Sequence, residues 1–124
     1  MIKTALGDLT FDTGWKTSLM VTLFEKTYKI TVKAKAYFEK DGITDAQKDS
    51  ITKFSKNKDK ILNKIMTNMK IYDENSENRF TPRTLLFNRD GSGAILFDDS
   101  EYPDEGIATC FFPDYNIVSQ DEYL

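Results

Sequence analysis

Five carboxylates close together in the sequence are the residues best suited to chemistry. They are Asp98, Asp99, Glu101, Asp104 and Glu105. Clustered carboxylate oxygens can bind Ca²⁺ or Mg²⁺, and a pair of carboxyl groups can carry out acid–base hydrolysis, as in glycosidases. The spacing does not match an EF-hand loop, and acidic loops are common on protein surfaces. We therefore predict no metal ligand here and interpret the five residues as a candidate contact for a partner.

Histidine is absent from the chain, and Cys110 is the only cysteine. The commonest general base, the commonest zinc ligand and the thiol–imidazole pair are thereby excluded. Cys110 lies in the apolar run 107–112 and is expected to be a small core residue. Asp90–Gly93 lacks the lysine and the helix of a phosphate-binding loop, so it predicts a turn between strands. We predict no catalytic, cofactor-binding or metal-binding residue, and enzymatic activity is not favoured.

The elements that position these residues are organised around a strand at Tyr28–Phe38. Apolar side chains alternate there with Lys29, Thr31, Lys33 and Lys35. This alternation predicts one buried and one solvent-exposed sheet face. Strands at Ala5–Phe11 and Trp15–Phe24 precede it, and polar connections of turn length at 12–14 and 25–27 separate the three. The first third therefore predicts a three-stranded antiparallel meander.

A helical segment follows from Thr44 to about Tyr72. Thr44 and Gln47 have the spacing of a capping box, and apolar residues then recur on one face of the helix. Lys58 interrupts this apolar face, and a straight helix of this length would be about 43 Å long, which exceeds the width of a small domain. We therefore expect a bend or break within Ser55–Lys58.

After a polar loop at 73–78, the sequence returns to strands. They are expected at Thr84–Asn88, Ala94–Asp98, Ile107–Phe112 and Tyr115–Val118. The order strands–helix–strands predicts an α+β fold in one domain, 1–124. We expect an antiparallel sheet of about six or seven strands, with one bent or broken helical segment packed on one face and lysines on the open face.

Charge is unevenly distributed along the chain. Residues 1–70 carry a net charge of +6 and residues 71–124 carry −9, which together give −3. Lysines on an open sheet face are compatible with RNA binding, but acidity and the lack of stacking aromatics there argue against nucleic acid. No apolar stretch reaches membrane-spanning length and no signal peptide is seen, so we expect no membrane contact and a cytoplasmic location.

A second surface hypothesis concerns the strand at 15–24. Trp15, Met20 and Phe24 share its less regular face. They either form an exposed apolar patch for a partner or are covered by the N-terminal residues or a loop.

Several short motifs are spread over nearly the whole chain: Leu6–Leu9, Phe80–Pro82, Leu85–Gly93, Leu96–Asp98, Gly106–Ala108, Phe112-Pro113 and Gln120–Leu124. With these motifs the chain resembles a family of small bacterial domains of unknown function. Such domains are similar in size and acidity to immunity proteins that accompany bacterial toxins. The resemblance implies a protein-binding module whose acidic surface meets a basic partner.

Two functions remain open at this point. The first is a non-enzymatic protein–protein interaction module, in the role of an immunity or accessory protein. The second is a small-molecule or divalent-metal-binding protein. This second hypothesis includes a hydrolase that uses carboxylates for catalysis. A concave pocket with convergent polar groups favours the second, whereas a flat charged or apolar surface favours the first.

Overall fold

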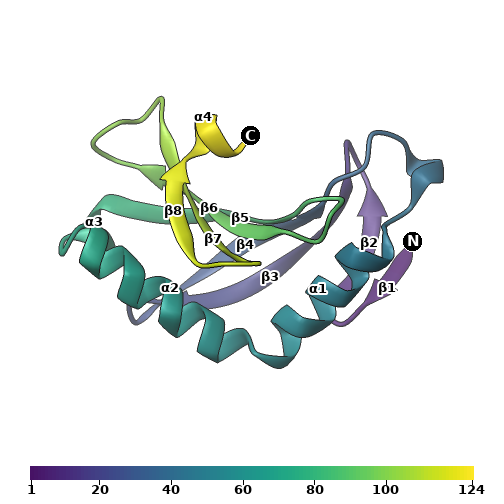
Figure 1. Cartoon of the computed structure of the whole chain (residues 1–124), viewed down its shortest axis with the longest axis horizontal. Helices are drawn as coiled ribbons and strands as arrows, with labels where there is room; N and C mark the ends of the chain where they lie inside the picture. The colour runs from purple at the N-terminus through teal and green to yellow at the C-terminus, as the bar shows by residue number, and fades with distance from the viewer.

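The computed structural model describes residues 1–124 and shows one curved, eight-stranded sheet with helices on both faces (Figure 1). The strands lie side by side in chain order: β1 (Ile2–Thr4), β2 (Gly7–Phe11), β3 (Trp15–Leu23), β4 (Lys26–Ala34), β5 (Phe80–Phe87), β6 (Gly93–Asp99), β7 (Gly106–Phe112) and β8 (Asn116–Ser119). The helices are α1 (Asp45–Lys56), α2 (Lys58–Tyr72), α3 (Ser76–Arg79) and α4 (Gln120–Tyr123), with a 3₁₀ turn η1 (Glu39–Asp41). The α+β fold class is confirmed. The sheet has eight strands, whereas the sequence predicts about six or seven.

The N-terminal meander has four strands rather than three. The sequence analysis missed β1, which pairs antiparallel with β2. The turn between β3 and β4 is formed by Phe24 and Glu25, whose φ angles are 52° and 64°. Positive φ at both central residues is the type I′ geometry of a two-residue hairpin, so the turn lies slightly before the predicted connection at 25–27.

The predicted alternation in β4 is confirmed. Ile30, Val32 and Ala34 are at most 2% exposed and belong to the main core. The strand ends at Ala34, however, and the prediction that it continues to residue 38 is wrong. Tyr37 is 93% and Phe38 62% exposed, because the chain leaves the sheet there to form η1.

The helical segment is broken where the sequence predicts it. Asn57 has φ −117° and ψ 21°, which ends α1 before α2 begins. The predicted capping box is present: the backbone N–H of Gln47 donates to Thr44 Oγ1 at 3.0 Å, and the backbone N–H of Thr44 donates to Gln47 Oε1 at 2.9 Å. Lys58 is the first residue of α2, and its ammonium group donates a hydrogen bond to the carbonyl of Met20 on β3 at 3.2 Å. The charged end of this side chain therefore has a polar partner.

The pairing of β4 with β5 is parallel, which corrects the expectation of a purely antiparallel sheet. Helices α1 and α2 run back across one face of the sheet, so the chain enters β5 at the same edge where β4 began (Figure 1). A crossover of this kind necessarily joins parallel strands. The carboxyl ends of β4 and β5 consequently meet at one edge.

The core lies between α1, α2 and the sheet. Phe54 from α1 packs against Phe87 and Phe111, with ring centroids 6.2 Å and 5.3 Å away. Trp15 and Phe24 also belong to the core at 4% and 8% exposure, whereas Met20 is 54% exposed. The hypothesis of an exposed patch formed by these last three residues is therefore wrong. Phe11 packs against Trp15, as the N-terminal alternative predicts, whereas Met66 and Lys70 of α2 lie against Phe24.

The face opposite α1 and α2 is only partly open, which corrects a second expectation. Leu86, Ala94 and Ala108 alternate with core residues and so point to that face, yet they are at most 2% exposed. The C-terminal helix α4, which the sequence analysis missed, lies over β7 and β8 on that side (Figure 1). The short helix α3 was also missed, because it begins inside the predicted loop 73–78. None of the helices is long and apolar enough to cross a membrane.

Candidate functional site

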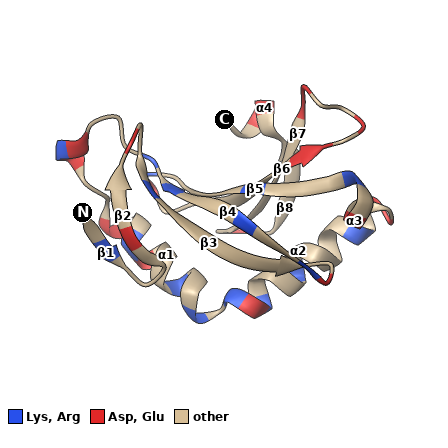
Figure 2. Ribbon diagram, turned by 180° about the vertical axis from the view of Figure 1, so that it is seen from behind, with Lys and Arg blue, Asp and Glu red and all other residues tan.

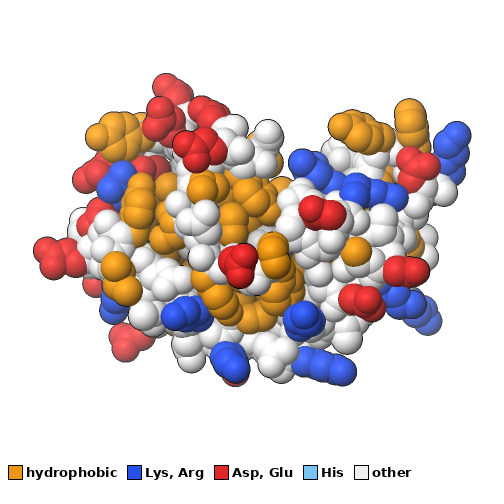
Figure 3. All heavy atoms as spheres, viewed as in Figure 1, with side chains coloured by type: hydrophobic (Ala, Val, Ile, Leu, Met, Phe, Trp, Pro, Cys, Tyr) orange, Lys and Arg blue, Asp and Glu red, His pale blue; other side chains and the backbone are white.

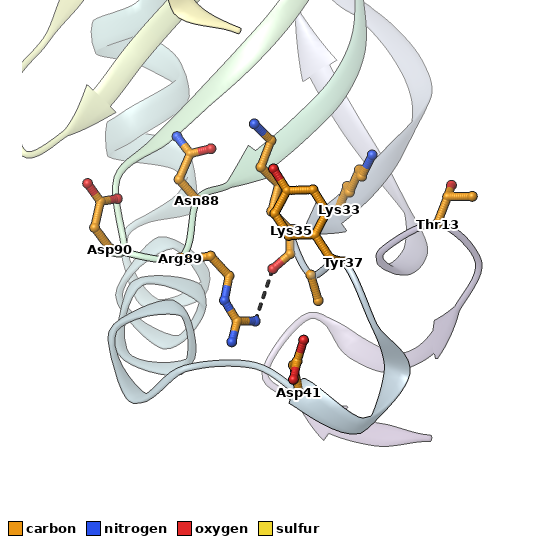
Figure 4. Close-up of a pocket in the computed structure, with 9 residues that line it drawn as sticks. Thr13, Lys33, Lys35, Tyr37, Asp41, Asn88, Arg89 and Asp90 are labelled. Atoms are coloured by element: carbon orange, nitrogen blue, oxygen red, sulfur yellow. Dashed lines mark hydrogen bonds between the residues drawn. The ribbon is translucent and has the colours of Figure 1, made fainter.

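A cavity of about 640 Å³ opens where β4 and β5 end (Figure 4). We call it the edge pocket. It is lined by Thr13 from the β2–β3 turn, by Lys33 and the segment after β4, by η1, and by the β5–β6 turn: Thr13, Lys33, Lys35, Ala36, Tyr37, Asp41, Asn88, Arg89 and Asp90. Ligand sites commonly form at the carboxyl ends of parallel strands. The only parallel pair in this sheet therefore gathers polar side chains from four separate segments.

A buried glutamine joins the two strand ends behind this pocket. Gln47 is fully buried, and its Nε2 donates to the carbonyls of Lys35 and Phe87 at 3.0 and 3.1 Å. Arg89 Nη1 donates to the same Lys35 carbonyl at 3.1 Å and to that of Gly42 at 2.8 Å, which ties the β5–β6 turn to the segment after β4. The first turn of α1 thus holds the pocket floor in one arrangement.

Removing this amide is expected to destabilise the protein measurably. Gln47→Leu leaves the Thr44 N–H without its acceptor and removes one hydrogen-bond donor each from the carbonyls of Lys35 and Phe87, so we expect a loss of about 2 kcal/mol in the free energy of unfolding. Urea denaturation measures it. Lys48→Ala, next to Gln47 and exposed, is the control, with an expected change within about 0.5 kcal/mol. Equal effects of the two substitutions contradict the assigned role of Gln47.

The β5–β6 turn is fastened to α1 from the other side. Thr44 Oγ1 donates to the Arg89 carbonyl at 2.7 Å, and Ser50 Oγ donates to the Gly91 carbonyl at 2.6 Å. Gly91 has φ 89°, and a Cβ added there would lie 2.9 Å from the Ala46 carbonyl, so glycine is required by both conformation and space. Asp90 accepts from the backbone and hydroxyl of Ser92, and these bonds lower the pKa of its carboxyl group. The predicted turn at 90–93 is confirmed.

Positive charge at the pocket has no carboxylate partner. Lys16 and Lys33 are directly opposite one another on β3 and β4, and Lys35 follows two residues after Lys33. Neither these lysines nor Arg89 forms a salt bridge. The cations that form one are Arg79 and Arg83. Partial burial, together with the charges of Lys16 and Lys35, lowers the pKa of the Lys33 ammonium. Unpaired like charges in a concave site favour the binding of an anion.

Side-chain orientation in the edge pocket is visible in Figure 4. The ring of Tyr37 lies between the side chains of Lys33 and Lys35 in this view, and Arg89 and Asp41 lie below them. Asn88 Nδ2 donates to Ser92 Oγ and Tyr123 Oη at 3.0 and 2.8 Å, which connects the pocket wall to α4. The site therefore offers cations, an exposed aromatic ring and two carboxylates on its margin.

Three carboxylates of the acidic segment at 98–105 form salt bridges with two arginines. Arg79 holds both oxygens of Asp99 at 2.9 and 2.8 Å, and it also contacts Glu101 at 3.1 Å and Asp73 at 2.9 Å. The guanidinium lowers the pKa values of the Asp99 and Asp73 carboxyl groups. Asp98 pairs with Arg83. No group of three or more carboxylate, thiol or imidazole side chains is arranged to hold a metal ion.

Only two of the five predicted contact residues stay free of an arginine. Asp104 and Glu105 are exposed and form no salt bridge. The loop between β6 and β7 nevertheless remains the acidic end of the molecule, and lysines are spaced along α1 and α2 (Figure 2). Cys110 lies half-buried in β7, where burial raises the pKa of its thiol.

A smaller hollow of about 370 Å³ lies between the end of α2 and β8. It is lined by Asn68, Ile71, Tyr72, Tyr115, Asn116 and Ile117. Ile71 is 81% and Tyr72 52% exposed. Apolar side chains gather over α2 and β8 in the space-filling view, which also shows a hollow above the sheet between an acidic lobe and a lobe rich in lysine and arginine (Figure 3).

Sequence reasoning placed Lys33 and Lys35 on the solvent-exposed face but did not identify the edge pocket. The parallel pairing of β4 with β5 was not predicted, and this pairing brings Arg89 and Asn88 into one pocket with lysines more than 50 positions earlier in the chain. One signal was present: Lys16, Lys33 and Lys35 are spaced to meet across a hairpin. Comparisons with protein-family models, with curated proteins and with solved structures found no match to this chain.

Proposed function

We propose that this chain is a binding protein that holds an anionic group of its ligand in the edge pocket. The observation that carries the proposal is that Lys33, Lys35 and Arg89 line one concave site and form no salt bridge with Asp41 or Asp90, which line it too. A concave pocket lined by polar groups supports the second of the two functions left open by the sequence. The group bound is a carboxylate or a phosphate, because both accept hydrogen bonds from lysine and arginine.

The acidic contact surface proposed from the sequence stays a prediction. Asp98, Asp99 and Glu101 already pair with Arg83 or Arg79, so a basic partner would find only Asp104 and Glu105 unpaired. Exposed charges of this kind steer association but add little affinity. A protein partner that instead inserted an acidic side chain would use the edge pocket in the same way as a small anion.

Titration with small anions tests the proposal. Pyrophosphate and citrate are expected to shift the backbone amide resonances of Lys33, Lys35 and Arg89 in NMR spectra, with an affinity that falls as salt is added. Lys35→Gln removes one charged donor and is expected to weaken binding about tenfold, since a hydrogen bond to a charged group is worth about 1.5 kcal/mol. Arg89 is unsuitable for this test because it also supports the fold.

Lys29→Gln is the matched control. Lys29 lies on β4, six residues before Lys35, is exposed, and does not line the edge pocket. It is expected to leave affinity within about twofold of the native protein. Equal losses in both variants, or amide shifts spread over all surface lysines, indicate non-specific attraction and contradict the proposal. A synthetic peptide rich in glutamate, titrated in parallel, separates a protein source of the carboxylate from a small ligand.

A further inference from the structure

We propose that Lys33 bonds covalently and reversibly with an aldehyde or ketone carried by the anionic ligand of the edge pocket. This inference rests on the proposed function, because the anion must first be held beside Lys33. It goes further by assigning a reactive atom, Lys33 Nζ, and a chemical class of ligand, an anionic carbonyl compound.

The stem of Lys33 is held in place by a glycine on the neighbouring turn. A Cβ added at Gly14 would lie 2.7 Å from Lys33 Cε and 3.4 Å from its Cγ, so the lysine packs directly on the Gly14 backbone. Gly14 has φ 136°, a conformation that other residues rarely adopt. The side chain is half-buried and lines the 640 Å³ pocket. Its amine is therefore positioned by packing at the margin of a space that admits a small molecule.

The surroundings of Lys33 lower the pKa of its ammonium group. Lys16 is its cross-strand partner and Lys35 lies two residues on, while Asp41 and Asp90 line the pocket without reaching salt-bridge distance. Burial and the two neighbouring ammonium groups lower its pKa. Desolvation and an adjacent cation are the two means by which proteins activate lysine as a nucleophile. Lys35 remains available to hold the anion, as do the N–H groups of Arg89 other than those of Nη1, which donates to the carbonyls of Lys35 and Gly42.

The chemistry conserves atoms and requires no oxidant. The lone pair of neutral Lys33 Nζ attacks the carbonyl carbon, a proton passes from nitrogen to the resulting alkoxide, and a carbinolamine forms. Loss of the hydroxyl group as water then gives the imine. Addition of water reverses the sequence and releases the unchanged carbonyl compound. Binding of this kind is selective, because an anion without a carbonyl is held only by charge.

Pyridoxal 5′-phosphate is a suitable probe, since it combines a phosphate with an aldehyde. The full chain is incubated with it at neutral pH and a low molar ratio, reduced with borohydride, digested and mapped by mass spectrometry. We expect the reduced adduct mainly on Lys33. Lys33→Met and Lys33→Arg are expected to lose that adduct, and the arginine variant retains the charge and a long stem if the methionine variant folds poorly. Lys29→Met, from the same strand face, is expected to label like the native protein.

Pyridoxine 5′-phosphate, which has an alcohol in place of the aldehyde, separates the two proposals. If it binds at the edge pocket and pyridoxal 5′-phosphate gives no preferred adduct at Lys33, the covalent inference is wrong and the anion site stands. Label concentrated on Lys16 or Lys35, or spread evenly over the lysines, also overturns the assignment to Lys33. If neither compound binds at the pocket, the proposed function is wrong and the inference is overturned with it.

Discussion

Replacing Phe54 with alanine is expected to lower the free energy of unfolding by about 4 kcal/mol. Phe54 is fully buried in α1, and its ring packs against Phe87 on β5 and Phe111 on β7. Truncation removes the contact that joins the crossover helix to the centre of the sheet and leaves a cavity that three rigid elements cannot close. Urea denaturation followed by circular dichroism measures the loss.

Phe38→Ala is the matched control for this substitution. Phe38 is 62% exposed and lies outside the core, so the same chemical change is expected to alter stability by no more than about 0.5 kcal/mol. A loss below about 1.5 kcal/mol for Phe54→Ala contradicts the packing of α1 described here, because substitutions of buried phenylalanine by alanine cost more than that.

Arg79→Met is expected to lower the free energy of unfolding at pH 7 by about 3 kcal/mol. The guanidinium binds both oxygens of Asp99, whose side chain is only 4% exposed, and also pairs with Asp73 and Glu101. Methionine keeps most of the apolar stem but leaves the Asp99 carboxylate desolvated and unpaired. Arg83→Met breaks an exposed pair with Asp98 and is expected to cost no more than about 1 kcal/mol.

Acid is expected to reduce the difference between the native protein and Arg79→Met. The pKa of Asp99 in the folded state is lowered, mainly by its hydrogen bonds to Arg79. Its contribution to stability is therefore complete above the unfolded pKa of about 3.9 and is lost as pH falls through the lower folded value. In the variant, burial without a cation favours the protonated form, so acid relieves the penalty. Urea midpoints at pH 7 and pH 3 measure the change; a constant difference contradicts the assigned ion pair.

Local patterns predicted the elements whose determinants lie close together in the sequence. The alternation of Ile30, Val32 and Ala34 reports a strand with one dry face, because successive side chains point to opposite sides. The pair Thr44 and Gln47 identified the start of α1 through hydrogen bonds that span three residues. The break near Lys58 followed from a charge on an apolar face and from helix length.

The short elements and the strand ends were less predictable. β1, α3 and α4 contain three or four residues each, which is too few for a periodic pattern. The end of β4 was placed too late because Ala36 and Phe38 continue its alternation by composition alone. There the chain turns into η1, and no local residue type marks the point where pairing with β5 stops.

By itself, the sequence determined an α+β chain, a strand β4 with one apolar face, a capped and interrupted helical segment, and the absence of histidine. These properties depend on side chains within a few positions of one another. Only the tertiary structure decided which distant charges meet. Parallel pairing of β4 with β5 brings Lys33 and Lys35 to the same pocket as Arg89, whereas antiparallel pairing of β5 with β6 places Asp99 beside Arg79. The physical reason is that charge interactions depend on distance in space, and sequence separation does not report that distance.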